Sequence, residues 1–207
     1  AALRSSADMM VVRAWDDSLA RSASEIMIAR ADWVTERSGD FCKYYEMISG
    51  KISASMLYVS KVSIKDWNQE QVYSKCLQAL EESWSRDAFR KNTSQGPHLD
   101  ELLLTLQGDQ TLGEIREIGS GGQRRTAALA LRLIEGDTIR RSRGVQPILL
   151  LDDAFAELDD GRRERVLLLM DQDRFGQVIM TAPKESDVQI HGEKLYQWGI
   201  REGTIYA

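Results

Sequence analysis

Two adjacent carboxylates after an apolar run are the residues best placed to do chemistry. The run Ile148–Leu151 suits a buried strand, and Asp152 and Asp153 follow it directly. Open α/β sheets bind their ligands at the carboxyl ends of the strands, where these charges would lie. Nucleotide hydrolysis needs one carboxylate to hold hydrated Mg²⁺ and another group to orient water. We therefore predict two catalytic residues, Asp152 as the metal ligand and Asp153 as the water-orienting group. The alternative is a turn that merely contains two Asp residues.

A glycine-rich loop that opens a helix is the second candidate. Glycines let the backbone approach an anion closely, and a helix N-terminus offers N–H groups at the positive end of its dipole. The Ser120 hydroxyl adds a donor, and Arg124 and Arg125 raise the local positive potential. The alternative is a flexible connector. The predicted phosphate-contacting residues are Gly119, Ser120, Gly121, Gly122 and Gln123.

The elements that must position these motifs alternate between helix and strand. In order, they are a helix from Gln123 to about Arg143, a strand at Ile148–Leu151, a helix capped by Asp159 or Asp160, a strand at Gln177–Thr181, and a hairpin of 195–200 with 204–206. Such alternation is typical of an α/β layered domain.

The first part of the chain is mostly helical. An apolar stripe at helical spacing predicts a long packed helix, through Met9, Val12, Trp15, Leu19, Ile26, Ala29 and Trp33. Ser38–Asp40 is predicted to interrupt it. Further predictions are a strand at 56–59, a helix capped by Asn68, and a hairpin in which Leu102, Leu104 and Leu106 precede a turn at Gly108–Asp109. We expect a helical arm domain over 1–93 and a lobe over 94–207.

Composition limits the class of protein. The chain has 207 residues, 43% of them hydrophobic, and a net charge of −5, which argues against a surface that binds nucleic acid throughout. Cys42 and Cys76 form no CxxC pair, so we expect reduced thiols, no zinc site, and a cytoplasmic protein. No run approaches the roughly 20 apolar residues that a membrane helix needs.

The order of the motifs resembles the ABC-type ATPases of the SMC and RecF group. Gly119–Gln123 resembles their signature motif, Ile148–Asp153 their Walker B strand, and Glu157–Asp159 their D-loop, while Thr181 occupies the place of the switch residue. The resemblance implies nucleotide contacts for Glu157, Asp159 and Thr181. It is closest to the RecF family, over the segments "TSQGPHLDELLL", "GSGGQRRTAALALRL", "PILLLDDAFAELDDGRRERVL" and "GQVIMTAP". The implied fold class is α/β, an ABC-ATPase-type lobe with an attached helical arm.

The chain departs from the pattern of that family at several points. Leu99 stands where the family usually has Arg, Thr181 is not His, and Asp153 stands where ABC transporters carry Glu, which favours slow hydrolysis. The sequence contains no G-x-x-x-x-G-K-[ST] loop to cradle phosphates. We therefore expect a C-terminal piece or one subunit of a split protein, inactive by itself, with weak or absent nucleotide binding.

The resemblance also implies the function of the completed protein. It would be a cytoplasmic recombination and repair mediator that binds duplex DNA near single-strand gaps, dimerises around ATP and Mg²⁺, and helps load RecA with RecO and RecR. Its partner in the lobe would be the missing P-loop half, and no membrane would be involved. Two alternatives stay open: another SMC-like chromosome or defence ATPase, and a non-catalytic interaction module that retains the fold.

Overall fold

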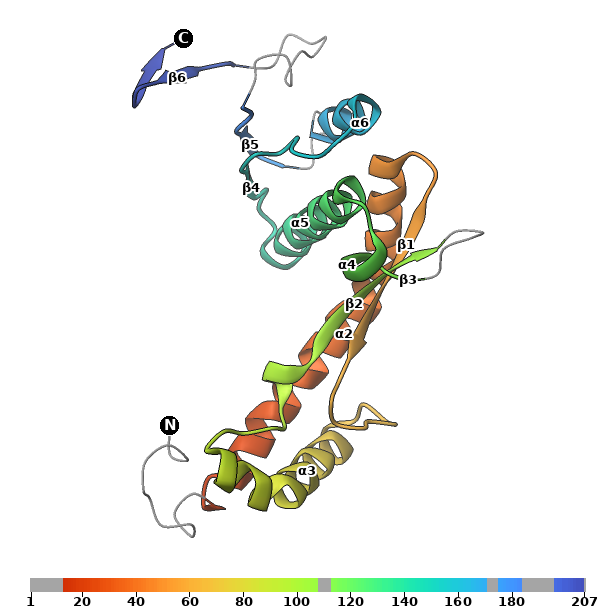
Figure 1. Cartoon of the computed structure of the whole chain (residues 1–207), viewed down its shortest axis with the longest axis vertical. Coiled ribbons are helices and arrows are strands. Elements are labelled where there is room, and N and C mark those ends of the chain that lie inside the picture. The colour runs from red at the N-terminus through yellow and green to blue at the C-terminus, as the bar shows by residue number, and fades with distance from the viewer. Residues whose placement is uncertain (1–12, 108–112, 171–174, 184–195, 207) are drawn as a thin grey trace. The chain divides into compact units, whose positions relative to one another are not determined.

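The computed structural model describes residues 13–107, 113–170, 175–183 and 196–206. The chain divides into two compact units, Ala1–Glu135 and Gly136–Ala207 (Figure 1). The predicted domain boundary after Thr93 falls inside the first unit and stays a prediction.

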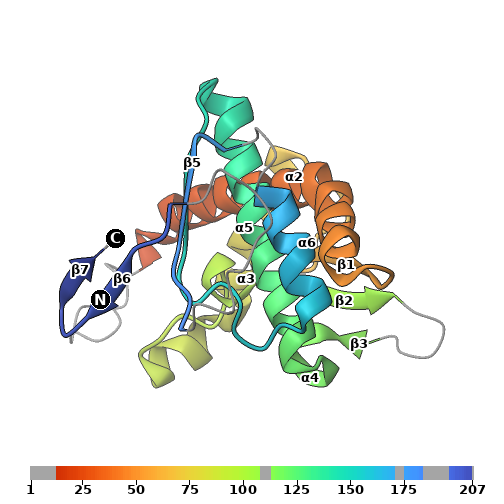
Figure 2. The same ribbon diagram turned by 90° about the horizontal axis from the view of Figure 1, so that it is seen from above.

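The first unit combines long helices with a small antiparallel sheet. Its elements are α2 (Asp16–Ser49), β1 (Ser53–Val59), α3 (Gln69–Arg90), the 3-10 helix η2 (Pro97–Leu99), β2 (Glu101–Gln107), β3 (Gly113–Glu114), α4 (Ile115–Ile118) and the first part of α5 (Gly121–Arg143). The strand order is β1-β2-β3, and β2 and β3 run side by side in Figure 2. The turn predicted at Gly108–Asp109 lies outside the described residues.

Helix α2 is continuous, so the predicted break at Ser38–Asp40 is wrong. A side chain at Gly39 would meet nothing within 4 Å, and an exposed helical glycine costs only about 1 kcal/mol relative to Ala. Residues after it, including Phe41 and Tyr45, are fully buried, and the helix packs against both β1 and α3. The free energy from this packing outweighs the low helix propensity of Gly39. The helix ends at Gly50, which adopts a left-handed φ of 90°.

The core-facing stripe of α2 also differs from the prediction. Trp15 is 64% exposed, and Leu19 and Ile26 are each 44% exposed. In the same stretch of the helix the buried side chains are instead Ala20, Ala23, Ser24, Met27, Ala31 and Val34. Ala20, Ala23 and Met27 form one buried cluster with residues of α3, while the larger Leu19 and Ile26 stay partly exposed. Met9 and Val12 of the predicted stripe lie outside the described residues.

Strand β1 pairs along its whole length with β2, from Ser53 opposite Gln107 to Val59 opposite Glu101. The predicted strand at 56–59 is therefore confirmed and begins earlier. The predicted helix after Asn68 is also confirmed, because the Asn68 side chain accepts a hydrogen bond of 2.9 Å from the Gln71 N–H at the start of α3.

The second unit contains the end of α5, β4 (Ile148–Leu151), α6 (Asp160–Met170), β5 (Gln177–Met180), β6 (Gly199–Arg201) and β7 (Thr204–Tyr206). Strands β4 and β5 are parallel, with Leu150 opposite Ile179. Strands β6 and β7 pair as the predicted hairpin, although β6 begins only at Gly199 and Leu195 lies outside the described residues. The expectation that β4 is buried holds for one face only: Leu149 and Leu151 are buried, whereas Ile148 is 62% and Leu150 68% exposed.

Candidate nucleotide site

The turn after β4 carries the two predicted catalytic carboxylates. Both Asp152 and Asp153 are exposed, while Ala154 and Phe155 directly after them are buried and anchor the turn. Asp153 has a φ of 48°, in the left-handed region that non-glycine residues rarely adopt and that Asp tolerates better than most. The turn therefore holds the two carboxylates at the carboxyl end of the strand in a defined and strained backbone.

Thr181 is bonded to this turn through every one of its polar groups. Its hydroxyl donates to Asp152 Oδ1 at 2.7 Å and accepts from the Asp153 N–H at 2.8 Å. Its own N–H donates to Leu151 O at 3.0 Å, and its carbonyl accepts from the Ala154 N–H at 3.2 Å. The structure thus brings Asp152, Asp153 and Thr181 together, although Thr181 is far from the other two in sequence.

The predicted D-loop residues follow the same turn. Glu157 is exposed, with a left-handed φ of 61°. Asp159 is the N-cap of α6: its Oδ1 accepts from the Arg162 N–H at 2.9 Å, and its Oδ2 pairs with the Arg162 guanidinium at 3.0 Å. The bond from the Arg162 N–H lowers the pKa of Asp159 below its usual value. Of the two predicted caps, Asp159 is therefore the one whose side chain caps α6.

The glycine loop opens α5 in the first unit and is fastened by a capping box. The Ser120 N–H donates to Gln123 Oε1 at 2.8 Å, and the Gln123 N–H donates to Ser120 Oγ at 3.3 Å. A side chain on Gly119 would approach Ile115 O to 2.4 Å, so only glycine fits there. Arg124 donates to Gly119 O at 2.9 Å, and the first turn of α5 holds no acidic residue. This helix start therefore favours an anion.

Some of these contacts were absent from the sequence reasoning. The serine-x-x-glutamine spacing is a sequence signature of the capping box, whereas our prediction assigned Ser120 and Gln123 to phosphate contacts alone. The hydroxyl bridge from Thr181 to Asp152 joins two separate strands, and no local signal in the sequence reports it.

The donor set of the turn fits Mg²⁺. Mg²⁺ in nucleotide sites is held by one or two carboxylates together with phosphates and waters. Asp152 offers an exposed carboxylate at such a position. Within the described parts of the chain, no group of three or more His, Cys, Asp or Glu side chains could hold a metal ion.

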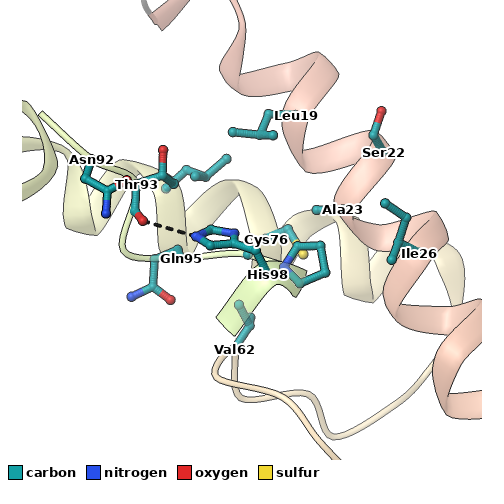
Figure 3. A pocket seen from close by; sticks show the side chains of 13 residues that line it. Leu19, Ser22, Ala23, Ile26, Val62, Cys76, Asn92, Thr93, Gln95 and His98 are labelled. Carbon is teal, nitrogen blue, oxygen red and sulfur yellow. Dashed lines mark hydrogen bonds between the residues drawn. The ribbon is translucent and has the colours of Figure 1, made fainter. Parts of the chain in front are cut away.

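A separate cavity lies in the first unit (Figure 3). It encloses about 310 Å³ between α2, α3 and the segment Asn92–His98, with Leu19, Ile26 and Val62 among its apolar lining. The segment is fixed by a 2.6 Å bond from Arg30 to Pro97 O and by His98, whose Nε2 lies 3.2 Å from Thr93 O. The Gly-Pro-His part of the chain thus forms one wall of this cavity, and no predicted nucleotide residue lines it.

No helix among the residues that the structure describes combines the length and the apolar character needed to cross a bilayer.

Comparison with known proteins identifies the family. No family model matches the sequence. The DNA replication and repair protein RecF of Oenococcus oeni is 34% identical over 194 residues, which cover 92% of this chain and 50% of that protein. RecF of Streptomyces avermitilis is 34% identical over 205 residues, covering 98% and 50%. The chain is homologous to the C-terminal half of RecF.

A solved structure supports the same family. The structure described as the recombination mediator protein RecF-ATPrS in the RecFOR pathway has a TM-score of 0.75 and 25% identity, and the match covers 99% of this chain and 52% of that one. The predicted RecF resemblance and the ABC-ATPase-type lobe fold are therefore confirmed. The chain spans about half the length of the RecF proteins it matches.

Proposed function

We propose that this chain supplies the Walker B turn, the D-loop and the signature loop of a RecF-type, ATP-dependent DNA-binding protein of recombination and repair. The observation that carries the proposal is the turn after β4 in a RecF homologue, where Asp152 and Asp153 are exposed and Thr181 fastens them. Without the homology to RecF, two aspartates at a strand end would be weak support for a nucleotide site.

Within this proposal, the two aspartates divide the hydrolytic work. Asp152 holds hydrated Mg²⁺, which neutralises charge on the β- and γ-phosphates when bound. Asp153 orients the attacking water and takes up its proton. The left-handed backbone conformation at Asp153 sets the direction in which its short side chain leaves the backbone. Because an aspartate reaches less far than a glutamate, hydrolysis is slow, as suits a switch.

The signature loop acts across a dimer. Ser120, Gly121, Gly122 and Gln123 contact the γ-phosphate bound to the opposite protomer, and Glu157 and Asp159 lie at the same interface. The positive end of α5 attracts the phosphate. ATP then contacts both protomers at once and stabilises the homodimer. In the structure the Ser120 hydroxyl accepts the Gln123 N–H, and this bond does not use the hydroxyl hydrogen that would donate to the phosphate.

The exposed aliphatic face of β4 and β5 supports a proposed binding surface for the P-loop half. Parallel sheets are nearly always covered on both faces, yet Ile148, Leu150 and Ile179 are 62%, 68% and 46% exposed. The RecF relatives contain another half outside the match. We propose that this half carries the P-loop, covers the face and completes the ATPase, so that the isolated chain has no measurable turnover.

The RecF relatives support a proposal for the wider function. We propose that the completed protein is cytoplasmic, binds duplex DNA near single-strand gaps, and helps load RecA together with RecO and RecR. The similar proteins reported above are RecF proteins, which favours this function over that of another SMC-like ATPase. A non-catalytic interaction module is the second candidate, and it predicts no turnover even after completion.

ATP-driven dimerisation tests the trans role of the signature loop. We expect the chain, completed with the N-terminal half of a RecF relative, to dimerise with Mg-ATP but not with Mg-ADP, as measured by light scattering. Ser120→Arg should abolish the dimer because its side chain occupies the phosphate position. Thr204→Arg, in β7, is the matched control. Dimers that persist in Ser120→Arg would contradict the trans role.

A further inference from the structure

Thr181 occupies the switch position of this chain, and its hydroxyl already donates a hydrogen bond within the chain. A threonine hydroxyl has one proton to donate and lone pairs that accept. The Thr181 hydroxyl donates a hydrogen bond of 2.7 Å to Asp152 Oδ1 and accepts one of 2.8 Å from the Asp153 N–H. A side chain that senses a γ-phosphate must donate a hydrogen bond to a phosphate oxygen. Thr181 cannot do so while it is bonded to Asp152.

The backbone of Thr181 faces the same turn. Its N–H bonds to Leu151 O at 3.0 Å, and its carbonyl accepts from the Ala154 N–H at 3.2 Å. The four hydrogen bonds of Thr181 therefore end on four consecutive residues, from Leu151 to Ala154. One of these four residues, Asp153, has a left-handed φ of 48°. Such a conformation costs roughly 1–2 kcal/mol for a non-glycine residue and persists only where the surroundings fix it.

We propose that Thr181 is a positioning residue that clamps the Walker B turn, and not a residue that contacts the γ-phosphate. Its hydroxyl fixes the Asp152 carboxylate on one side and holds the Asp153 N–H on the other, so that both acids keep one relative placement. This inference rests on the proposed ATPase function for its catalytic meaning, but the clamp itself exists in the isolated chain.

Amide hydrogen exchange in the isolated chain tests the clamp directly. Thr181→Val keeps the shape of the side chain and removes the hydroxyl. We expect the Asp153 amide to exchange roughly three- to tenfold faster, the effect of losing one hydrogen bond. The Ala154 amide is the internal control, because it bonds to the Thr181 backbone, which the substitution retains. Thr181→Ser should keep Asp153 exchange within about twofold of the native chain, since its hydroxyl remains.

Equal Asp153 exchange in the native chain and in Thr181→Val would overturn the clamp. If the valine variant fails to fold, the serine variant decides: faster Asp153 exchange with unchanged Ala154 exchange overturns the proposal, and native exchange at both amides supports it.

Kinetics of the completed protein separate a clamp from a phosphate sensor. A clamp predicts that Thr181→Val lowers kcat by about ten- to a hundredfold, the cost of misplaced catalytic groups, with the KM for ATP and the preference for ATP over ADP unchanged. Thr181→Ser should restore kcat. A selective loss of affinity for ATP over ADP in Thr181→Val would assign the sensor role instead. If the completed native protein shows no turnover, the proposed function fails, while the exchange experiment still decides the clamp.

Discussion

Neighbouring leucines in β4 should respond in opposite ways to truncation. Leu150 is 68% exposed and Leu149 is 7% exposed, on opposite faces of the same strand. Leu150→Ala removes little packing within the chain, so we expect its free energy of unfolding to change by less than about 0.5 kcal/mol. Leu149→Ala leaves a cavity in the core and should cost about 2–5 kcal/mol.

The effect on association with the P-loop half should be the reverse. Full burial of a leucine is worth about 1.5–3 kcal/mol. Since 68% of Leu150 is still exposed, covering it supplies about 1–2 kcal/mol, and its loss should weaken association about 5- to 30-fold. Urea unfolding of the chain and calorimetric titration with the separately purified P-loop half measure the two quantities. An unchanged Kd in Leu150→Ala would refute the placement of the P-loop half on this face.

Three further predictions concern the loops of the site. Ser120→Ala should destabilise the chain by about 1 kcal/mol in urea unfolding, because it removes the N-cap of α5; no loss of stability would contradict the capping box. Gly119→Ala should destabilise it more than Ser120→Ala in the same assay, since its Cβ would lie 2.4 Å from a backbone oxygen; equal stability of the two variants would count against that contact. Asp159 has a lowered pKa, so it stabilises the fold above the usual value of 3.8, and this contribution is lost as pH falls through the lowered pKa. The stability difference between the native chain and Asp159→Asn should therefore be constant above pH ~5 and shrink below pH ~4; a difference that grows on acidification would contradict this assignment.

Local signals in the sequence were sufficient for much of the fold. Asn68 marked the start of α3, the run Ile148–Leu151 marked β4, and the order of motifs indicated the lobe. These features depend on capping chemistry and on apolar runs, which neighbouring residues determine.

Predictions that depended on tertiary contacts were less accurate. The glycine at position 39 does not break α2 because buried aromatic residues beyond it pack against the sheet. Alanines of α2 lie in the buried cluster with α3, which the spacing of large apolar residues could not reveal. The prediction that β4 is buried on both faces was wrong for the face of Ile148 and Leu150. An apolar run in the sequence does not show whether the element that covers it belongs to the same chain. The bridge from Thr181 to the Walker B turn likewise requires two strands to pair.

Hydrolysis of Mg-ATP by the chain mixed with a P-loop half tests the central claim most directly. Turnover should appear only when both halves are present, and it should disappear when Asp152 is changed to Ala in an otherwise folded chain. Turnover by the isolated chain, or equal turnover by the mixture that carries Asp152→Ala, would contradict the assignment of this chain as the Walker B and signature half of a RecF-type ATPase.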